Sequence, residues 1–263
     1  MKKILLLISF LLISSQAFAS IVTKTVEYMD GTTLLEGYIA YDDSIAGKRP
    51  TVLIVHEWKG LEDYEKRRAE QLAAKGYVGF VIDLYGKGIH VKDHKEAAAL
   101  SGIYRNDRSL MRSRAKAALD FIQTFEFTNP DRIAAIGYCF GGTTVLEMAR
   151  AGFPLKGVAS FHGPLDTPVP AKEGEVKAKV IVFIGADDKS IPAESVVAFE
   201  KEMKDAKADF QIVILSGAVH SFTNPESGDD PSTGVAYNKK ADERSWEILE
   251  LFFKEIFLSD LMP

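Results

Sequence analysis

A single cysteine occupies a setting that is typical of a catalytic nucleophile. Cys139 is the middle residue of Gly-Tyr-Cys-Phe-Gly at 137–141, which follows an apolar run and precedes a helix-like stretch. This spacing is the nucleophile-elbow pattern, with cysteine in place of serine. The glycines leave room for a sharp strand-to-helix turn, which lifts the sulfur to a helix N-terminus where the dipole favours a thiolate. A lone cysteine is usually a small buried hydrophobe, but the flanking glycines favour a nucleophile here.

A cysteine nucleophile needs a base, and the base needs a carboxylate to orient it. Both occur downstream of Cys139, in the chain order nucleophile, acid, histidine. Asp187 and Asp188 follow one predicted strand, and His220 follows the next. Because sites in open α/β sheets lie at the carboxyl ends of strands, we predict that His220 is the base and that Asp188 or Asp187 is its partner.

The elements that must position these residues follow an α/β pattern. Short β-branched or apolar runs alternate with longer amphipathic stretches, which predicts a mostly parallel central sheet with helices on both faces. Asp30-Gly31 indicates an edge hairpin at 21–41, and residues 223–234 read as a surface loop. The predicted core strands are 51–56, 77–82, 132–137, 157–161, 179–184 and 210–215, and the predicted helices are 63–75, 92–124, 142–151, 193–206 and 237–256.

The N-terminus reads as a cleavable secretory signal. Lys2 and Lys3 precede an apolar run at 4–13, and Ala-Phe-Ala at 17–19 is a small-residue cleavage site. Residues 20–263 contain no long linker, so we predict one domain there. The expected location is the periplasm or the exterior, because no later stretch is long and apolar enough to span a membrane.

Composition excludes several classes of protein. The chain has 263 residues, of which 46% are hydrophobic, and its formal charge is −5. This balance excludes a disordered chain and lacks the basic surface of a nucleic-acid binder. The one cysteine has no internal disulfide partner. We therefore expect a small-molecule partner and no nucleic acid.

Five motifs are spread over nearly all of the chain after the signal segment. They are His-Glu-Trp-Lys-Gly at 56–60, Asp-Leu-Tyr at 83–85, Gly-Tyr-Cys-Phe-Gly-Gly at 137–142, Asp188 four residues before Pro192, and His-Ser-Phe at 220–222. Taken together, these motifs resemble those of the dienelactone hydrolase family, whose members have the α/β-hydrolase fold and a cysteine nucleophile. The resemblance implies that Cys139 is the nucleophile, His220 the base and Asp188 its partner.

The resemblance also implies roles for residues around the nucleophile. Glu57 would hydrogen-bond the resting thiol and receive its proton, which guards the cysteine against oxidation. The backbone N–H groups of Trp58 and Phe140 would form the oxyanion hole. Lys87 and Asn224 stand nearest the places where the family has two substrate-binding arginines, so we expect weaker binding of a carboxylated lactone.

Three further features carry less chemistry. His90 and His94 have the spacing of a metal pair on a helix, but no third ligand stands at a suitable distance along the chain. His162 follows a predicted strand and could either line the pocket or be a satisfied loop histidine. The basic residues between 105 and 116 are expected to form a solvated helix face. We predict neither a metal nor an organic cofactor.

The expected function is hydrolysis of a small ester or lactone through a cysteine acyl-enzyme. An acyl transferase or thioesterase could use the same triad. A non-catalytic ligand-binding or redox-sensing protein would need only the reactive thiol of Cys139. Asp188 and His220 favour the enzyme, since a sensor would not require them.

The predicted signal segment can be tested directly. Cleavage after Ala19 would leave Ser20 as the first residue, so N-terminal sequencing of protein from the periplasm or medium should begin there. Protein that retains Met1 in a membrane fraction would instead make the apolar run at 4–13 an anchor.

Overall fold

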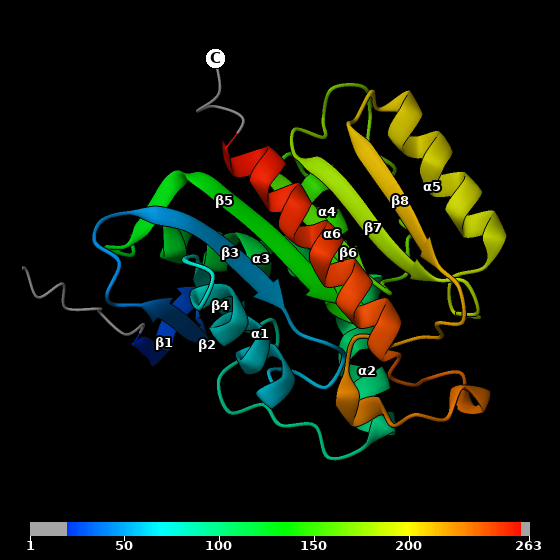
Figure 1. The fold of residues 1–263 in the computed structure, drawn as a ribbon, viewed down its shortest axis with the longest axis horizontal. Helices are drawn as coiled ribbons and strands as arrows, with labels where there is room; N and C mark the ends of the chain where they lie inside the picture. Colours follow the sequence, from blue (N-terminus) through cyan, green and yellow to red (C-terminus); the bar gives the residue numbers. More distant parts are fainter. Residues whose placement is uncertain (1–19, 259–263) are drawn as a thin grey trace, which may run out of the picture.

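An eight-stranded sheet forms the centre of the molecule (Figure 1). The computed structural model describes residues 20–258, so the predicted signal segment at 1–19 lies outside the described residues. The strands are β1 (Ile21–Asp30), β2 (Thr33–Asp42), β3 (Arg49–Val55), β4 (Val78–Ile82), β5 (Thr128–Tyr138), β6 (Gly157–Phe161), β7 (Lys179–Gly185) and β8 (Phe210–Leu215). Their order across the sheet is β1-β2-β4-β3-β5-β6-β7-β8. The β1–β2 hairpin pairs antiparallel with β4, and all later neighbours are parallel.

Helices cover both faces of this sheet. They are α1 (Asp63–Ala73), α2 (His94–Asn106), α3 (Arg108–Gln123), α4 (Phe140–Arg150), α5 (Ala193–Asp205) and α6 (Lys239–Leu258). Alternate strand residues face opposite layers: Leu53 and Val55 pack in the core with α3, α4 and α5, whereas Val52 and Ile54 pack with α1 and α6. Figure 1 shows α1 and α6 in front of the sheet and α3 and α4 behind it. The predicted fold class is therefore confirmed.

The sequence predicted most elements to within a few residues. Strands 157–161 and 210–215 have the predicted bounds, and the predicted hairpin is β1 and β2, with Gly31 at φ +59° in the turn. The predicted helix over 92–124 is wrong. It is two helices separated at Asp107, whose carboxylate accepts the backbone N–H of Leu110 and so caps the start of α3.

The predicted solvated face between 105 and 116 is also wrong for three of its arginines. Arg108 is buried and lies 3.5 Å from the carboxylate of Asp166, and Arg114 pairs with Asp30. Arg112 reaches a buried carboxylate on α4. These charges therefore fasten α3 to neighbouring elements instead of facing water.

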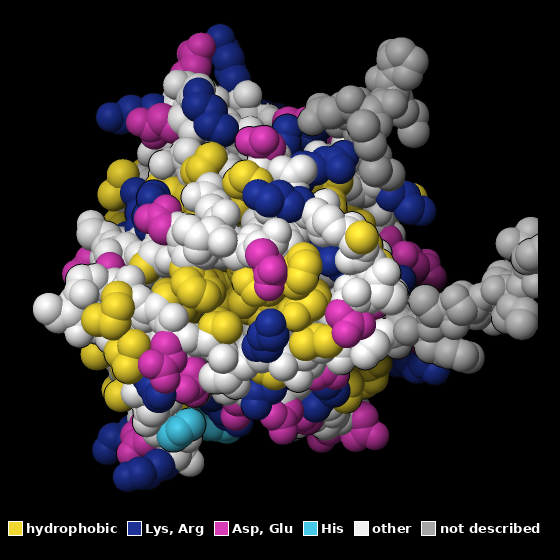
Figure 2. Space-filling model, turned by 90° about the vertical axis from the view of Figure 1, so that its left-hand side faces the viewer, with side chains coloured by type: hydrophobic (Ala, Val, Ile, Leu, Met, Phe, Trp, Pro, Cys, Tyr) yellow, Lys and Arg dark blue, Asp and Glu magenta, His cyan; other side chains and the backbone are white. Residues whose placement is uncertain are grey.

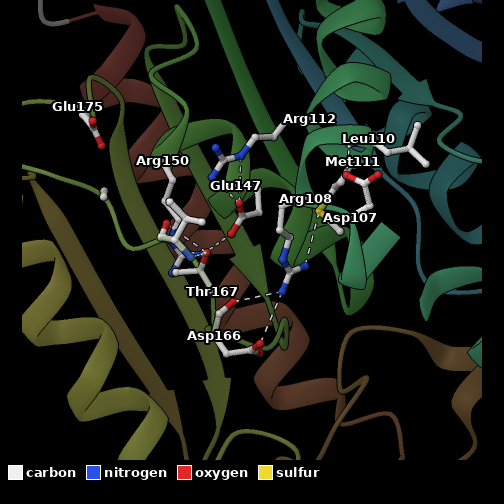
Figure 3. Close-up of polar contacts among 12 residues, drawn as sticks. Asp107, Arg108, Leu110, Met111, Arg112, Glu147, Arg150, Asp166, Thr167 and Glu175 are labelled. Carbon is white, nitrogen blue, oxygen red and sulfur yellow. Dashed lines mark hydrogen bonds and ion pairs between the residues drawn. The ribbon is translucent and has the colours of Figure 1, made fainter. Parts of the chain in front are cut away.

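A buried ion-pair network connects α3, α4 and α5, and Figure 3 shows its members Arg112, Glu147 and Arg150. The fully buried carboxylate of Glu147 accepts from Arg112 at 2.6 Å and from Arg150 at 3.1 Å. Arg150 is itself buried and also pairs with Glu202 of α5 at 2.8 Å. Every charge in this network thus has an opposite partner, which a buried charge requires.

Figure 2 views the molecule from the side on which β1 lies in Figure 1. Hydrophobic side chains gather in the middle of this face, and Lys and Arg are mixed with Asp and Glu around them. Neither sign of charge forms a continuous surface there. Within residues 20–258, no helix combines the length and the apolar character needed to cross a bilayer.

Removing one member of the buried network should cost far more than removing an exposed cation. We expect Arg150→Met to lower the free energy of unfolding by about 3 kcal/mol or more, because Glu202 and Glu147 lose a buried counter-charge. Lys116→Met is the matched control, since Lys116 pairs with Asp120 at the surface, and should cost less than about 1 kcal/mol. Urea unfolding measures both. Equal losses would contradict a structural role for the network.

Candidate active site

The backbone around Cys139 makes a tight turn between β5 and α4 that only glycines permit. Cys139 has φ +51° and ψ −113°, a left-handed region that is costly for residues other than glycine. A Cβ on Gly137 would lie 2.0 Å from the carbonyl oxygen of Gly141, and one on Gly141 would lie 2.2 Å from that of Val55. The strand and the helix can therefore approach this closely only without side chains at these two positions.

Three predicted residues from distant parts of the chain meet at this turn. Nε2 of His220 lies 3.1 Å from Sγ of Cys139, and Nδ1 of His220 lies 2.9 Å from Oδ2 of Asp188. Asp188 precedes α5 and His220 follows β8, so the carboxyl ends of three parallel strands supply the group. Asp187, the alternative acid, has an exposed side chain, and Asp188 is the carboxylate beside His220.

Ser190 holds the carboxylate of Asp188 in place, a role that the sequence did not indicate. Its backbone N–H and its hydroxyl both donate to Oδ1 of Asp188, at 2.8 and 2.6 Å. Oδ2 is thus left for the imidazole of His220. A serine two residues after an aspartate is a common local turn, which is the one signal that could have identified it.

Electrostatics in this group favours a charged imidazole at His220 and a charged carboxylate at Asp188. Burial alone would lower the pKa of His220, but the negative charge at Cys139 and the bond to Asp188 outweigh it and raise the pKa to about 10. Burial would raise the pKa of Asp188, yet its bonds to His220 and Ser190 lower the pKa overall. The arrangement therefore supports an imidazolium at His220 that lies between the sulfur of Cys139 and a carboxylate.

Most of the chain matches one family of known proteins, because residues 35–257 fit the model of the Dienelactone hydrolase family. The chain belongs to this family. The crystal structure of the dienelactone hydrolase-like promiscuous phosphotriesterase P91 from metagenomic libraries is 36% identical, has a TM-score of 0.85, and the match covers 91% of this chain and 99% of that one. "Protein usf" of Aquifex pyrophilus is 27% identical over 240 residues, which are 88% of this chain and 98% of that protein. "Putative carboxymethylenebutenolidase" of Aquifex aeolicus is 29% identical over 238 residues, which are 88% and 97% respectively.

The predicted oxyanion donors of this dienelactone hydrolase family member lie at the start of α4 and in the β3–α1 loop. Phe140 is the first residue of α4, so its backbone N–H has no acceptor within the helix. The carbonyl of Trp58 accepts the hydroxyl of Tyr85 at 2.8 Å, which fixes the peptide after it in the β3–α1 loop. The indole of Trp58 packs against the exposed imidazole of His94.

Glu57 does not bond the resting thiol, so that prediction is wrong for this state. Its two carboxylate oxygens accept the hydroxyl of Ser221 and the amide of Asn224, each at 2.9 Å, and the sulfur of Cys139 lies against His220. Asn224 was expected to face substrate, and this too is a correction. Its amide nitrogen binds Glu57 and its oxygen accepts the backbone N–H of Glu226, so both ends are occupied.

Lys87 lies outside the group around Cys139, contrary to the expectation that it lines the substrate pocket. Its ammonium pairs with Glu27 of β1 and lies 3.4 Å from Glu36 of β2. Its backbone N–H donates to the carbonyl of Leu34 at 2.8 Å, which holds the segment against the hairpin. Lys87 therefore belongs to the edge of the sheet.

A buried carboxyl that the sequence analysis missed supports the loop of Glu57. Glu65 accepts the backbone N–H groups of Glu57 and Glu62, both at 3.0 Å. Burial, followed by the charge of Glu57, raises the pKa of Glu65 to about 8. The Glu62 to Glu65 spacing at the start of α1 is a capping-box pattern, so this residue was detectable.

The remaining histidines give no metal site. His90 and His94 are exposed, and residues 20–258 contain no group of three or more His, Cys, Asp or Glu side chains placed to hold an ion. His162, which was left open between a pocket and a satisfied loop histidine, is fully buried with both ring nitrogens bonded.

Replacing Cys139 by serine should lower the pKa of His220. Burial lowers this pKa and both Cys139 and Asp188 raise it, so in the variant only Asp188 would counteract burial. In the wild type, His220 of the folded chain keeps its proton up to about pH 10. In the unfolded chain the same imidazole releases its proton near its ordinary pKa of 6.5. The stabilising contribution of this proton is therefore complete below pH 6.5 and lost as the pH rises through about 10.

NMR titration of the His220 imidazole and urea unfolding at several pH values measure these effects. We expect Cys139→Ser to titrate at lower pH and to lose less stability between pH 7 and 10 than the wild type. Identical titrations in the two proteins would mean that the sulfur does not carry the charge.

Proposed function

We propose that this protein hydrolyses a small ester or lactone through an acyl-enzyme on Cys139. The observation that carries the proposal is the contact of 3.1 Å between Sγ of Cys139 and Nε2 of His220, with Asp188 on the other ring nitrogen. A nucleophile, a base and an orienting carboxylate in this order are what acyl transfer requires. Family membership supports the same reaction class.

The first half of the reaction forms a thioester. The Cys139 thiolate attacks the carbonyl carbon, and the electron pair of the C=O bond moves to oxygen, which accepts the backbone N–H groups of Phe140 and Trp58. When the tetrahedral intermediate collapses, the C–O bond to the alcohol breaks. The His220 imidazolium gives its proton from Nε2 to the departing alkoxide. In a lactone, this alcohol stays attached to the acyl group.

The second half releases the product. Neutral His220 takes a proton from water, and the resulting hydroxide attacks the thioester carbonyl. Collapse of this intermediate breaks the C–S bond and returns the thiolate and imidazolium to their resting pair. Asp188, held by Ser190, keeps the imidazole in the tautomer that both halves need.

Two features favour an uncharged substrate. Lys87 is bound to Glu27 and Glu36, and the amide of Asn224 is bound to Glu57. Neither of the positions where the family has arginines therefore offers a cation for a carboxylate. We propose a periplasmic or secreted site of action, following the predicted signal segment.

Two alternative functions use some or all of the same residues. An acyl transferase or thioesterase would differ in the acceptor or in the acyl donor, so product analysis with added alcohols and thioesters distinguishes them. The similarity to the P91 structure makes a phosphotriester a further compound to include. A non-catalytic thiol sensor would leave Asp188 and His220 without a role.

The proposal predicts an acyl adduct on Cys139. Mass spectrometry of protein quenched after mixing with p-nitrophenyl acetate should find one acetyl group on the only cysteine. Cys139→Ala should abolish the adduct, and His220→Ala should slow its formation by roughly three orders of magnitude or more. Asp188→Ala should also slow it, whereas Asp187→Ala, at the exposed neighbouring position, should not. Unchanged turnover in Cys139→Ala would refute the mechanism.

A further inference from the structure

A second histidine contacts the nucleophile through its backbone. His162 directly follows β6 and is fully buried. Its Nδ1 accepts the backbone N–H of Cys139 at 3.1 Å, and its Nε2 lies 2.8 Å from Oγ1 of Thr223. The same N–H also donates to the carbonyl of Phe161 at 3.0 Å, so the nucleophile's amide is shared between two acceptors at the end of β6.

These contacts define the tautomer of His162. The backbone N–H of Cys139 is a donor, so Nδ1 must be unprotonated, and the ring proton is therefore on Nε2, which donates to Thr223. Burial, followed by the positive charges of His220 and Arg68, holds the pKa of His162 well below its usual range. The ring is therefore a fixed neutral acceptor for the nucleophile's amide.

Backbone strain gathers around this contact. Cys139, His162 and Ser221 have φ values of +51°, +42° and +59°, and the only other non-glycine residue with positive φ among residues 20–258 is Lys207. Each such conformation is unfavourable for a residue other than glycine and persists only where neighbouring bonds hold it. His162 therefore bonds to a strained residue, Cys139, and is itself in a strained conformation. A side chain that only filled the core would need neither feature.

The far side of His162 is anchored to two helices. The hydroxyl of Thr223 lies 2.7 Å from that of Tyr64 on α1. Arg68, also on α1, donates to the carbonyl of Thr223 at 2.9 Å and pairs with Asp242 of α6. The nucleophile's amide is thus connected through His162 to the helical layer that covers the front of the sheet in Figure 1.

We infer that His162 is a positioning residue for Cys139. Its Nδ1 fixes the amide of the nucleophile, and thereby holds Sγ beside His220 and the next amide, that of Phe140, toward the developing oxyanion. This role rests on the proposed acyl-enzyme function. It assigns His162 no proton transfer, since its nitrogens are both occupied and its ring stays neutral.

Two substitutions of His162 test the contacts of its two ring nitrogens one at a time. In His162→Asn the side-chain oxygen takes the place of Nδ1 and can accept the Cys139 N–H, and asparagine tolerates positive φ. In His162→Gln the amide nitrogen takes the place of Nε2 and keeps the Thr223 contact, but no acceptor remains at the Nδ1 position. The first variant therefore preserves the proposed contact and the second removes it.

A third variant controls for backbone strain. Glutamine is less tolerant of φ +42° than asparagine, so His162→Gly is included, because glycine adopts this conformation freely and offers no acceptor. Stopped-flow acylation with p-nitrophenyl acetate gives the rate constant and KM for each variant, and thermal unfolding gives its Tm. The full mature chain is used throughout.

We expect His162→Asn to acylate within about threefold of wild type. We expect both His162→Gln and His162→Gly to acylate roughly 10-fold more slowly with little change in KM, because the Cys139 N–H then keeps only the carbonyl of Phe161 and the strained turn loses one of the two contacts that fix it. The inference would be overturned if the acylation rate constant fell in proportion to Tm in all three variants. It would also be overturned if the rate constant fell equally in His162→Asn and His162→Gly. If Gln does not fold, the Asn and Gly pair decides. A wild type that forms no adduct on Cys139 would instead refute the proposed function.

Discussion

The close approach of β5, α4 and the end of β3 is the constraint on which the rest of the site depends. With glycine at 137 and 141, the carbonyl oxygens of Gly141 and Val55 occupy the space that Cβ atoms would need. This forces Cys139 into a left-handed turn at the carboxyl edge of the sheet. β6, β7 and β8 follow β5 in order across the sheet, so the loops after β7 and β8 bring Asp188 and His220 to the same edge. The order of the strands therefore brings His220 and Asp188 to the strained turn that carries Cys139.

The strained backbone of Cys139 keeps a single conformation only if rigid elements hold it. If the turn could adopt several conformations, the sulfur would lose its alignment with His220. Helix α4 begins at the residue after Cys139 and carries Glu147 and Arg150 on its second half. Their buried ion pairs fasten it to α3 and α5, and the pair between Arg112 of α3 and Glu147 is visible in Figure 3. Helices α1 and α6, on the other face of the sheet, hold the turn separately, because Arg68 of α1 bonds Thr223 and Thr223 bonds His162. The nucleophile is therefore held from both faces of the sheet.

The sequence predicted features that depend on nearby residues and missed those that depend on distant ones. The buried strand β6 and the half-exposed edge strand β8 are both short apolar runs, so both were predicted to the residue, and strand ends located Cys139, Asp188 and His220. Asp107 was missed because the amphipathic pattern continues across it. Lys87 and Asn224 were misplaced because their partners lie far along the chain: Lys87 pairs with Glu27, 60 residues earlier, and Asn224 with Glu57, 167 residues earlier. Periodicity carries no information about such pairs.

Two imidazoles of the same residue type illustrate how surroundings assign function. The rings of His220 and His162 are 5.3 Å apart and both contact Cys139, yet their pKa values are shifted in opposite directions. His220 faces the sulfur and a carboxylate, which raise its pKa, whereas the pKa of His162 is lowered first by complete burial and then by the charges of His220 and Arg68. Each shift reinforces the other's role, because a protonated His220 keeps His162 neutral and thereby preserves the acceptor for the Cys139 amide. Two neighbouring imidazoles can therefore hold different protonation states, as the proposed roles of His220 and His162 require.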